Sequence, residues 1–180
     1  MGRNTKSANF LKECMADALI RQMQIKDFSK ITINEIAEIA GVNRSTWFRN
    51  FNTKEEALTF KLVQLWNRYA TEHNLVARQD YRLNNAKDFF AFNYEIRELL
   101  HIISDAGLSA SIYQAFYELM MSQYGNTPAE CYEARFYSYG IFGFLTEWIK
   151  RNFQESAEEM TALFNQIIHS GTSLYDVPSR

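Results

Sequence analysis

The chain has 180 residues, a net charge of −2 and an aromatic content of 15%, with only two prolines and seven glycines. This length suits one or two small domains with a buried core. Because so few helix-breaking residues interrupt long stretches of helical periodicity, we expect an all-α fold.

Composition argues against the membrane and secreted classes. No apolar run approaches the length of a membrane span, and no N-terminal signal peptide is visible. Cys14 and Cys131 lie far apart within helical patterns, which is typical of small buried side chains and excludes a disulfide framework or a cysteine metal site. We therefore expect a cytoplasmic protein without a bound metal or cofactor.

Charge is distributed unevenly along the chain. Residues 1–58 hold nine Lys/Arg and seven Asp/Glu, whereas residues 59–180 hold ten and fourteen. The basic excess at the N-terminal end favours nucleic acid only weakly. Residues 1–7 are polar, and Arg3 and Lys6 either touch a phosphate or belong to a solvated tail.

The first predicted helix covers residues 8–25, where apolar residues such as Leu11, Met15 and Leu19 repeat at helical intervals. The stretch 31–58 then contains two short helical patterns. Thr32 with Glu35 forms a capping box that begins the first pattern, and Gly41 suits its left-handed end. Asn43 is placed to cap the second pattern. Two short helices around a glycine-containing turn predict a helix-turn-helix.

The second of these helices, over residues 44–51, carries polar and cationic side chains of a size that reaches phosphates and base edges in a major groove. Trp47 and Phe48 lie between them, and we expect at least one of these rings to face outward. An ordinary helical hairpin with a solvated basic face is the alternative interpretation. Thr53 with Glu56 is a second capping box, which opens a longer helix.

The stretch 36–58, which includes AEIAGVNRSTWFRNFNTKEEAL, resembles the signature of the TetR/AcrR family of bacterial transcriptional repressors. The matching residues are Ile36, Ala37, Ala40, Gly41, Val42, Thr46, Phe51, Lys54, Glu55 and Leu58. The resemblance implies a three-helix DNA-binding domain over residues 1–52. It also implies a helical ligand-binding and dimerisation domain over residues 53–180, in which a helix over about 53–77 links the two.

Three positions depart from the family pattern. Phe48 stands where a tyrosine usually donates to a DNA phosphate, Asn50 where histidine is common, and Trp47 where a smaller apolar residue is usual. These departures indicate that the chain recognises a different operator, or contacts the DNA backbone differently, from the family members it resembles. The predicted DNA-binding residues are Thr32, Asn43, Arg44, Ser45, Thr46, Trp47, Phe48, Arg49, Asn50 and Lys54.

Beyond the linking helix, residues 78–86 are polar and predict a loop. Helices are expected over 87–103, 109–124 and 129–152, with Thr127 and Pro128 starting the third. Ser156 with Glu159 is a third capping box, and the last helix should run to about Ser170. The stretch FNYEIRELLHIISDAG also loosely resembles short family members that regulate dihydroxyacetone kinase operons, some of which respond to a protein co-regulator.

Dimerisation is expected because one short recognition helix makes few contacts and a two-fold dimer doubles them on a palindrome. Gly140 and Gly143 each cost a helix about 1 kcal/mol relative to alanine, which a closely approaching partner helix would offset. The resemblance places the interface on the last two helices. The predicted interface residues, for which a role in the chain's own core is the alternative, are Gly140, Gly143, Phe144, Trp148, Phe164 and Ile168.

The resemblance also implies an inducer site in the C-terminal domain, and aromatic side chains at helical spacing are candidates for its lining, although the same spacing is typical of a core. The candidates are Phe89, Phe92, His101, Tyr113, Phe116, Tyr117 and Tyr137. No nucleophile pair, paired carboxylates, glycine-rich phosphate loop or metal spacing is present, which argues against an enzyme. The sequence thus predicts a homodimeric repressor that a ligand or protein partner releases from its operator; the alternative is a protein-controlled regulator or adaptor with weakened or lost DNA binding.

Overall fold

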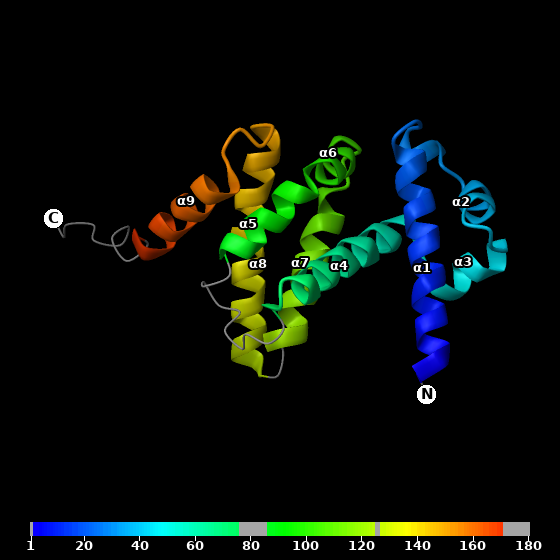
Figure 1. The fold of residues 1–180 in the computed structure, drawn as a ribbon, viewed down its shortest axis with the longest axis horizontal. Helices are drawn as coiled ribbons and strands as arrows, with labels where there is room; N and C mark the ends of the chain where they lie inside the picture. Colours follow the sequence, from blue (N-terminus) through cyan, green and yellow to red (C-terminus); the bar gives the residue numbers. More distant parts are fainter. Residues whose placement is uncertain (1, 76–85, 125–126, 171–180) are drawn as a thin grey trace.

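The computed structural model describes residues 2–75, 86–124 and 127–170. Within these ranges the chain is helical and contains no strand, which confirms the predicted all-α fold. Figure 1 shows α2 and α3 at one end of an elongated molecule and α9 at the other. The predicted loop over 78–86 lies almost entirely outside the described residues.

The N-terminal head consists of α1 (Gly2–Met23), a short 3-10 turn η1 (Phe28–Lys30), α2 (Ile33–Ile39) and α3 (Arg44–Asn50). The first helix thus begins six residues before the predicted start at residue 8. The apolar stripe of α1 covers α2 and α3, and the residues that meet there are fully or almost fully buried. This core contains Met15, Leu19, Ile31, Ile36, Trp47 and Phe51.

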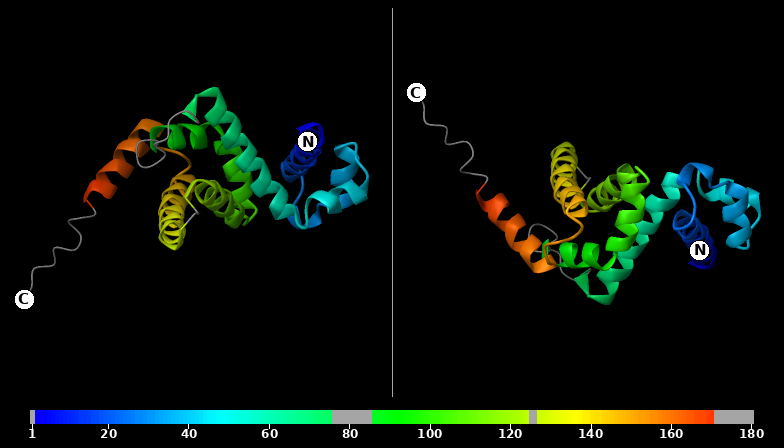
Figure 2. Two further views of the ribbon diagram at one scale, coloured as in Figure 1. Left: turned by 90° about the horizontal axis from the view of Figure 1, so that it is seen from below. Right: turned by 90° about the horizontal axis from the view of Figure 1, so that it is seen from above.

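Helix α4 (Lys54–Glu72) connects the head to the rest of the chain, and both views in Figure 2 show it running between them. Lys61, which is 8% exposed, contacts Asp17 of α1 at 2.7 Å, and Arg68 contacts Glu13 of α1 at 3.0 Å. On the body side, the Thr59 hydroxyl donates to the Ser111 carbonyl at 3.4 Å. Ion pairs thus join α4 to the head, and a buried hydrogen bond joins it to the body.

The body contains α5 (Ala86–Glu95), α6 (Arg97–Asp105), α7 (Ser109–Tyr124), α8 (Pro128–Lys150) and α9 (Ala157–Ser170). The prediction of one continuous helix over 87–103 was wrong. Ile96 leaves the helical conformation, at φ −94° and ψ 14°, and separates α5 from α6. This break allows α5 to pack against α9 while α6 packs against α7 and α8. No glycine or proline lies at Ile96, so the break between α5 and α6 results from tertiary packing and not from the local sequence.

The capping residues predicted for the body are confirmed. Thr127 accepts a hydrogen bond from the Glu130 amide, while the Glu130 carboxylate accepts one from the Thr127 amide, and Pro128 occupies the first turn. Ser156 and Glu159 exchange the same pair of bonds at the start of α9. These reciprocal bonds satisfy amides that a helix start leaves without partners.

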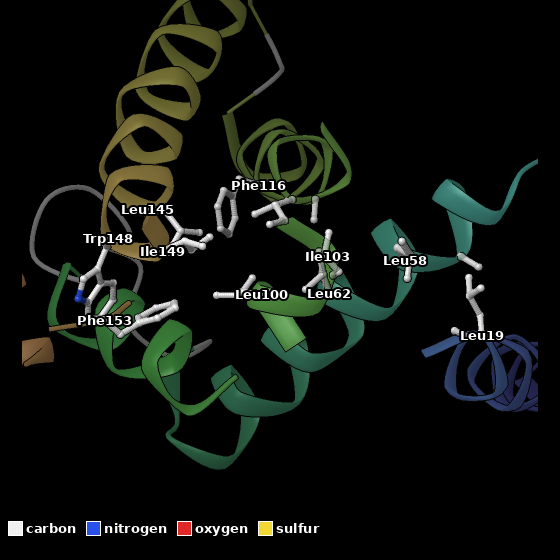
Figure 3. Packing of buried hydrophobic residues seen from close by; sticks show 14 of the residues in the cluster. Leu19, Leu58, Leu62, Leu100, Ile103, Phe116, Leu145, Trp148, Ile149 and Phe153 are labelled. Carbon is white, nitrogen blue, oxygen red and sulfur yellow. The ribbon is translucent and has the colours of Figure 1, made fainter. Parts of the chain in front are cut away.

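One continuous core runs from the head into the body. Figure 3 follows it from Leu19 on α1, through Leu58 and Leu62 on α4, to Trp148 on α8. In the body this core is largely aromatic: the ring of Phe90 lies 5.7 Å from those of both Trp148 and Phe164. A smaller cluster of Tyr69, Ala70, Leu75 and Phe92 joins the end of α4 to α5. The excess of aromatic residues is thus used mainly to build the body.

Candidate functional site

The turn between α2 and α3 has the geometry of a helix-turn-helix. Thr32 and Glu35 form the predicted capping box at the start of α2. Gly41 adopts φ +67°, and the Val42 amide donates to the Ala37 carbonyl at 2.9 Å. An L side chain at this φ is strained, so glycine is what permits the sharp turn. Asn43 occupies the cap position of α3 but makes no side-chain capping bond, unlike the prediction.

The outer face of α3 carries the predicted DNA-binding side chains. Arg44, Ser45, Phe48 and Arg49 are exposed, and Thr46 and Asn50 are half-buried. Since α3 lies at the end of the molecule remote from α9, this face is open to a large partner (Figure 1). Two guanidinium groups on one exposed helix face suit phosphates and guanine edges, which both accept paired hydrogen bonds.

Both arginines are held close to α3 by weak contacts. The guanidinium of Arg44 lies 5.3 Å from the centroid of the Phe48 ring. Arg49 donates to the Ser45 carbonyl at 3.3 Å and to the Thr46 hydroxyl at 3.2 Å. These exposed contacts cost little to exchange for bonds to DNA, because surface interactions of charged groups contribute little stability.

Two other predicted DNA-binding residues, Asn50 and Thr32, already make hydrogen bonds within the head. The Asn50 side-chain amide donates to the Thr46 carbonyl at 2.7 Å. The Thr32 hydroxyl donates to Glu35 Oε2 at 2.8 Å and accepts from the Glu35 amide at 3.3 Å. Asn50 therefore has its carbonyl oxygen to offer. Thr32 acts mainly by shaping the start of α2.

Trp47 is a correction to the predicted DNA-binding set. Its side chain is 0% exposed, and its ring lies 5.2 Å from that of Phe51, within the head core. Residues 47 and 51 are four apart and therefore share the face of α3 that packs against the head. Phe48 is the ring that points outward, at 54% exposure. The expectation that at least one of the two aromatic rings faces outward is confirmed.

Lys54 holds the head together from the first turn of α4. Its ammonium donates to the Phe28 carbonyl at 2.5 Å and to the Ile31 carbonyl at 2.9 Å, and it lies 4.1 Å from the Phe28 ring centroid. Desolvation lowers the pKa of this ammonium. A role in binding phosphate would therefore be additional to a role in fixing η1 against α4.

Two carboxylates at helix starts in the head, those of Glu35 and Glu56, have lowered pKa values. Hydrogen bonds from Lys26 and then from Thr32 lower the pKa of Glu35 to about 2. Hydrogen bonds from the backbone and side chain of Asn52 lower the pKa of Glu56. The predicted capping box of Thr53 and Glu56 is only half formed: the Thr53 hydroxyl accepts from the Glu56 amide, but the Glu56 carboxylate accepts from the Asn52 amide instead of the Thr53 amide. Both carboxylates stay ionised at neutral pH.

The predicted interface residues of the body divide into two groups. Gly140 and Gly143 are exposed on α8, and a Cβ added at either would meet nothing within 4 Å. Trp148 and Phe164, however, are buried in the core of the same chain, at 1% and 5% exposure, so they are not available to a partner. Phe144 and Ile168 are half-buried and pack at the edge of this core.

Sequence reasoning missed the exposed aromatic residues on the glycine face of α8. Tyr132, Phe136 and Tyr139 are 79%, 74% and 58% exposed. Their spacing of four and three residues places them on one helix face, which continues through Gly143. Leu163 and Ile167 on α9 are also exposed and line, with Gly143, an apolar groove of about 300 Å³ between α8 and α9. A helical-wheel inspection of α8 would have found this surface.

Of the predicted inducer-site residues, His101 alone lines either of the two hollows described in the body. Phe89, Phe92 and Phe116 pack against other rings of the cores. Tyr113 accepts a hydrogen bond from Arg135 at 2.7 Å, and the same guanidinium lies 3.6 Å from the Tyr117 ring centroid. Tyr137 is exposed on α8. His101 lines a polar hollow at the junction of α5 and α6.

Among the described residues no group of His, Cys, Asp and Glu side chains is arranged to hold a metal ion. None of the helices in the described ranges combines the length and the hydropathy that a membrane span requires.

Comparison with known proteins identifies the C-terminal part of the body. A TetR family model, described as the transcriptional regulator C-terminal region, matches residues 93–170. The match covers α6 to α9 and the end of α5, which is the part of the body that carries the α8–α9 face. The comparison with curated proteins found no match. This match over residues 93–170, together with the helix-turn-helix in the head, supports a TetR-family transcriptional regulator.

Proposed function

We propose that the chain is a homodimeric cytoplasmic repressor that binds a palindromic DNA operator and is released when a ligand or a protein partner binds its body. The domain that contacts DNA comprises residues 1–52, and residues 53–180 form the domain that dimerises and binds the effector. The protein carries no catalytic activity. The observation that supports the proposal most is the exposed face of α3 at the free end of the head.

The DNA contacts follow from what each side chain on α3 can donate. Arg44 and Arg49 offer guanidinium groups to phosphates or guanine edges, while Ser45 and Thr46 offer hydroxyls. Phe48 has no hydroxyl and offers only packing against sugar or a thymine methyl group. Asn43 and Asn50 flank these groups at the two ends of the helix. Thr32 and Lys54 support the DNA-binding surface by fixing α2 and η1.

The proposed dimer interface is the exposed face of α8 and α9. Glycines in a helix interior cost stability, and no part of the described chain approaches Gly140 or Gly143 closely enough to explain them. A second copy packing there would place its helix against the backbone of α8 and cover Tyr132, Phe136, Leu163 and Ile167. Aromatic residues are enriched in such interfaces, and a contiguous exposed apolar surface is typical of one.

Release from DNA would require that the effector change the spacing of the two heads. Helix α4 is attached to the head through Lys61 and Asp17 and to the body through Thr59 and Ser111. A shift of α7 can therefore tilt the head. The effector acts only to the extent that it binds the released arrangement more tightly than the DNA-bound one.

The direct test is an electrophoretic shift with duplex DNA from the region upstream of the chain's own gene. The proposal predicts a retarded complex with two protomers on each palindrome. The complex should be lost in the double variant Arg44→Ala/Arg49→Ala and retained in Arg21→Ala, whose exposed arginine lies on α1. A shift that is equally strong in the double variant would contradict the placement of the DNA contacts on α3.

The exposure of Phe48 supports a second candidate, in which the regulator acts through protein contact and binds DNA weakly or not at all. Phe48→Tyr separates the two functions, because a tyrosine hydroxyl there can donate to a phosphate. Under the repressor proposal the wild-type chain already shifts its DNA. If only Phe48→Tyr shifts DNA, the protein-controlled adaptor is the better description.

A further inference from the structure

A polar hollow of about 250 Å³ lies where the α5–α6 junction meets the turn after α8, away from the helix-turn-helix and from the face of α8 that carries Gly140 and Gly143. Six residues line it: Tyr94, Arg97, Glu98, His101, Asn152 and Phe153. Its volume suits a molecule of amino-acid size. Its lining contains a cation, an anion, an imidazole and a side-chain amide.

The charged groups of this hollow have no charged partner among the described residues. Arg97 donates one hydrogen bond to the Tyr94 carbonyl at 2.9 Å, and its guanidinium lies 4.7 Å from the Tyr94 ring centroid. These contacts hold the guanidinium at the rim and leave its other donors available. The Glu98 carboxylate makes no ion pair or hydrogen bond within the described chain. A cation and an anion that share one hollow, each without a charged partner among the described residues, complement a ligand that carries both charges.

The backbone that closes the hollow is strained. Asn152 and Phe153 adopt φ values of +56° and +52°, in the left-handed region that a bulky residue such as phenylalanine rarely enters. Phe153 is held there because its ring lies 4.7 Å from the Trp148 ring and 5.3 Å from the His101 ring. Figure 3 shows its side chain pointing in toward the core, on the side of Leu100. Such conformations cluster at functional sites.

We propose that this hollow binds a small polar α-amino acid as its zwitterion. The Arg97 guanidinium would take the carboxylate through paired hydrogen bonds, since its planar fork matches that group. The Glu98 carboxylate would take the ammonium. The His101 imidazole and the Asn152 amide would bond a polar side chain of the ligand.

This site gives the proposed repressor an effector and a path to the interface, and that coupling rests on the proposed function. Asn152 and Phe153 belong to the turn that leads from α8 into α9. A ligand bonded to Asn152 would bias the strained turn and hence the angle between the two helices of the proposed dimer face. Binding itself does not depend on DNA.

The test is a titration of the full chain, without DNA, with each standard polar amino acid, followed by NMR of the His101 ring protons. These resonances are assigned by their absence in His101→Asn. The inference predicts a saturable shift for at least one amino acid. Analogues that lack one charged group then test each charge separately. If the ligand is L-glutamine, for example, 4-carbamoylbutanoate lacks only the amino group and 4-aminobutanamide lacks only the carboxylate. Equivalent pairs serve for other ligands. Each analogue should bind about tenfold more weakly or worse.

Variants locate the site. Arg97→Met and Glu98→Gln should each weaken binding about tenfold or more, and Arg97→Lys should also weaken it because the paired bonds are lost. Arg21→Met, on α1, is the matched control and should bind as the wild type does. Circular dichroism checks that each variant is folded.

The inference is overturned if no polar amino acid gives a saturable shift, or if both analogues bind as tightly as their parent. It is also overturned if all folded variants bind like the wild type. A failed electrophoretic shift together with intact binding would instead reject the repressor and leave this site standing.

Discussion

The head and the body both expose large apolar side chains, but they do so in different ways. In the head these side chains lie on separate elements: Phe10 on α1, Ile25 after it, Ile39 on α2 and Phe48 on α3. In the body, three of them (Tyr132, Phe136 and Tyr139) share one face of α8 and two (Leu163 and Ile167) lie on α9. Single exposed apolar residues are normal on a protein surface, whereas a contiguous group marks an interface.

This contrast separates two kinds of binding surface. The head offers charge and hydrogen-bond donors on an otherwise closed three-helix core, which suits a polar partner such as DNA. The body offers apolar area and bare backbone at two glycines, which suits a second copy of the same helices. If the two surfaces differ as their chemistry indicates, substitutions in the head and in the body should have distinct effects.

The largest expected difference in stability is between substitutions of two adjacent aromatic residues on α3. Trp47→Ala should lower the free energy of unfolding by about 3–5 kcal/mol, because it empties the centre of the head core. Phe48→Ala should change it by less than about 0.5 kcal/mol, since the ring is mostly exposed. Denaturant unfolding of both variants measures the difference. Equal losses would mean that the head does not bury Trp47 as described.

The next largest effect should be on dimerisation, from substitutions on the glycine face of α8. Gly143→Leu should separate the dimer into monomers, because the side chain would occupy the space of the partner helix. Ala110→Leu, at an exposed position on α7, should leave the assembly unchanged. Sedimentation measures both. Gly143→Ala provides a sharper comparison: an isolated chain should gain about 1 kcal/mol of stability from it, since the added Cβ has open space, whereas a dimer should lose stability.

Substitution of Lys54 should cause a smaller loss of stability, confined to the head. Lys54→Met leaves the Phe28 and Ile31 carbonyls without their donor, and we expect a loss of about 1–3 kcal/mol. Lys30→Met is the matched control, because its exposed ammonium bonds Asp27 alone among the described residues and its loss should cost much less. Thermal unfolding compares them. If Lys54→Met instead left stability unchanged and lowered the salt dependence of DNA binding, phosphate binding would be its main role.

Acid should weaken the start of α2 only slightly. Because the folded-state pKa of Glu35 is lowered from 4.5 to about 2, its contribution to stability is present above pH 4.5 and is lost as the pH falls toward 2. Glu35→Gln should therefore reduce the pH dependence of unfolding between these values. Glu38→Gln removes a charge from the same helix without disturbing the capping box and serves as the control. An unchanged pH dependence in Glu35→Gln would contradict the assignment.

Local patterns in the sequence predicted the helices and their caps because those features depend on neighbouring residues. Thr32, Gly41, Thr127 and Ser156 all occupy the predicted positions. The break at Ile96 could not be predicted, since it results from α5 packing on α9. Packing between distant segments decides such a feature, and no residue near it carries a signal.

The candidate surfaces were predicted less completely than the fold. A basic helix after a glycine turn identified the outer face of α3, but helical spacing alone could not decide whether Trp47 or Phe48 faces inward. The same limit applies to the body, where Trp148 and Phe164 close the core instead of facing a partner. Aromatic residues suit both locations, so only their three-dimensional neighbours distinguish an interface from a core.

The central claim is that two chains join through α8 and α9 and present two α3 helices to one palindrome. Sedimentation of the full chain with fluorescent operator DNA tests it most directly. The account predicts a free species of twice the 21.1 kDa chain mass and a complex with two chains on each palindromic site. A 21.1 kDa monomer that binds a single half-site with full affinity would contradict it.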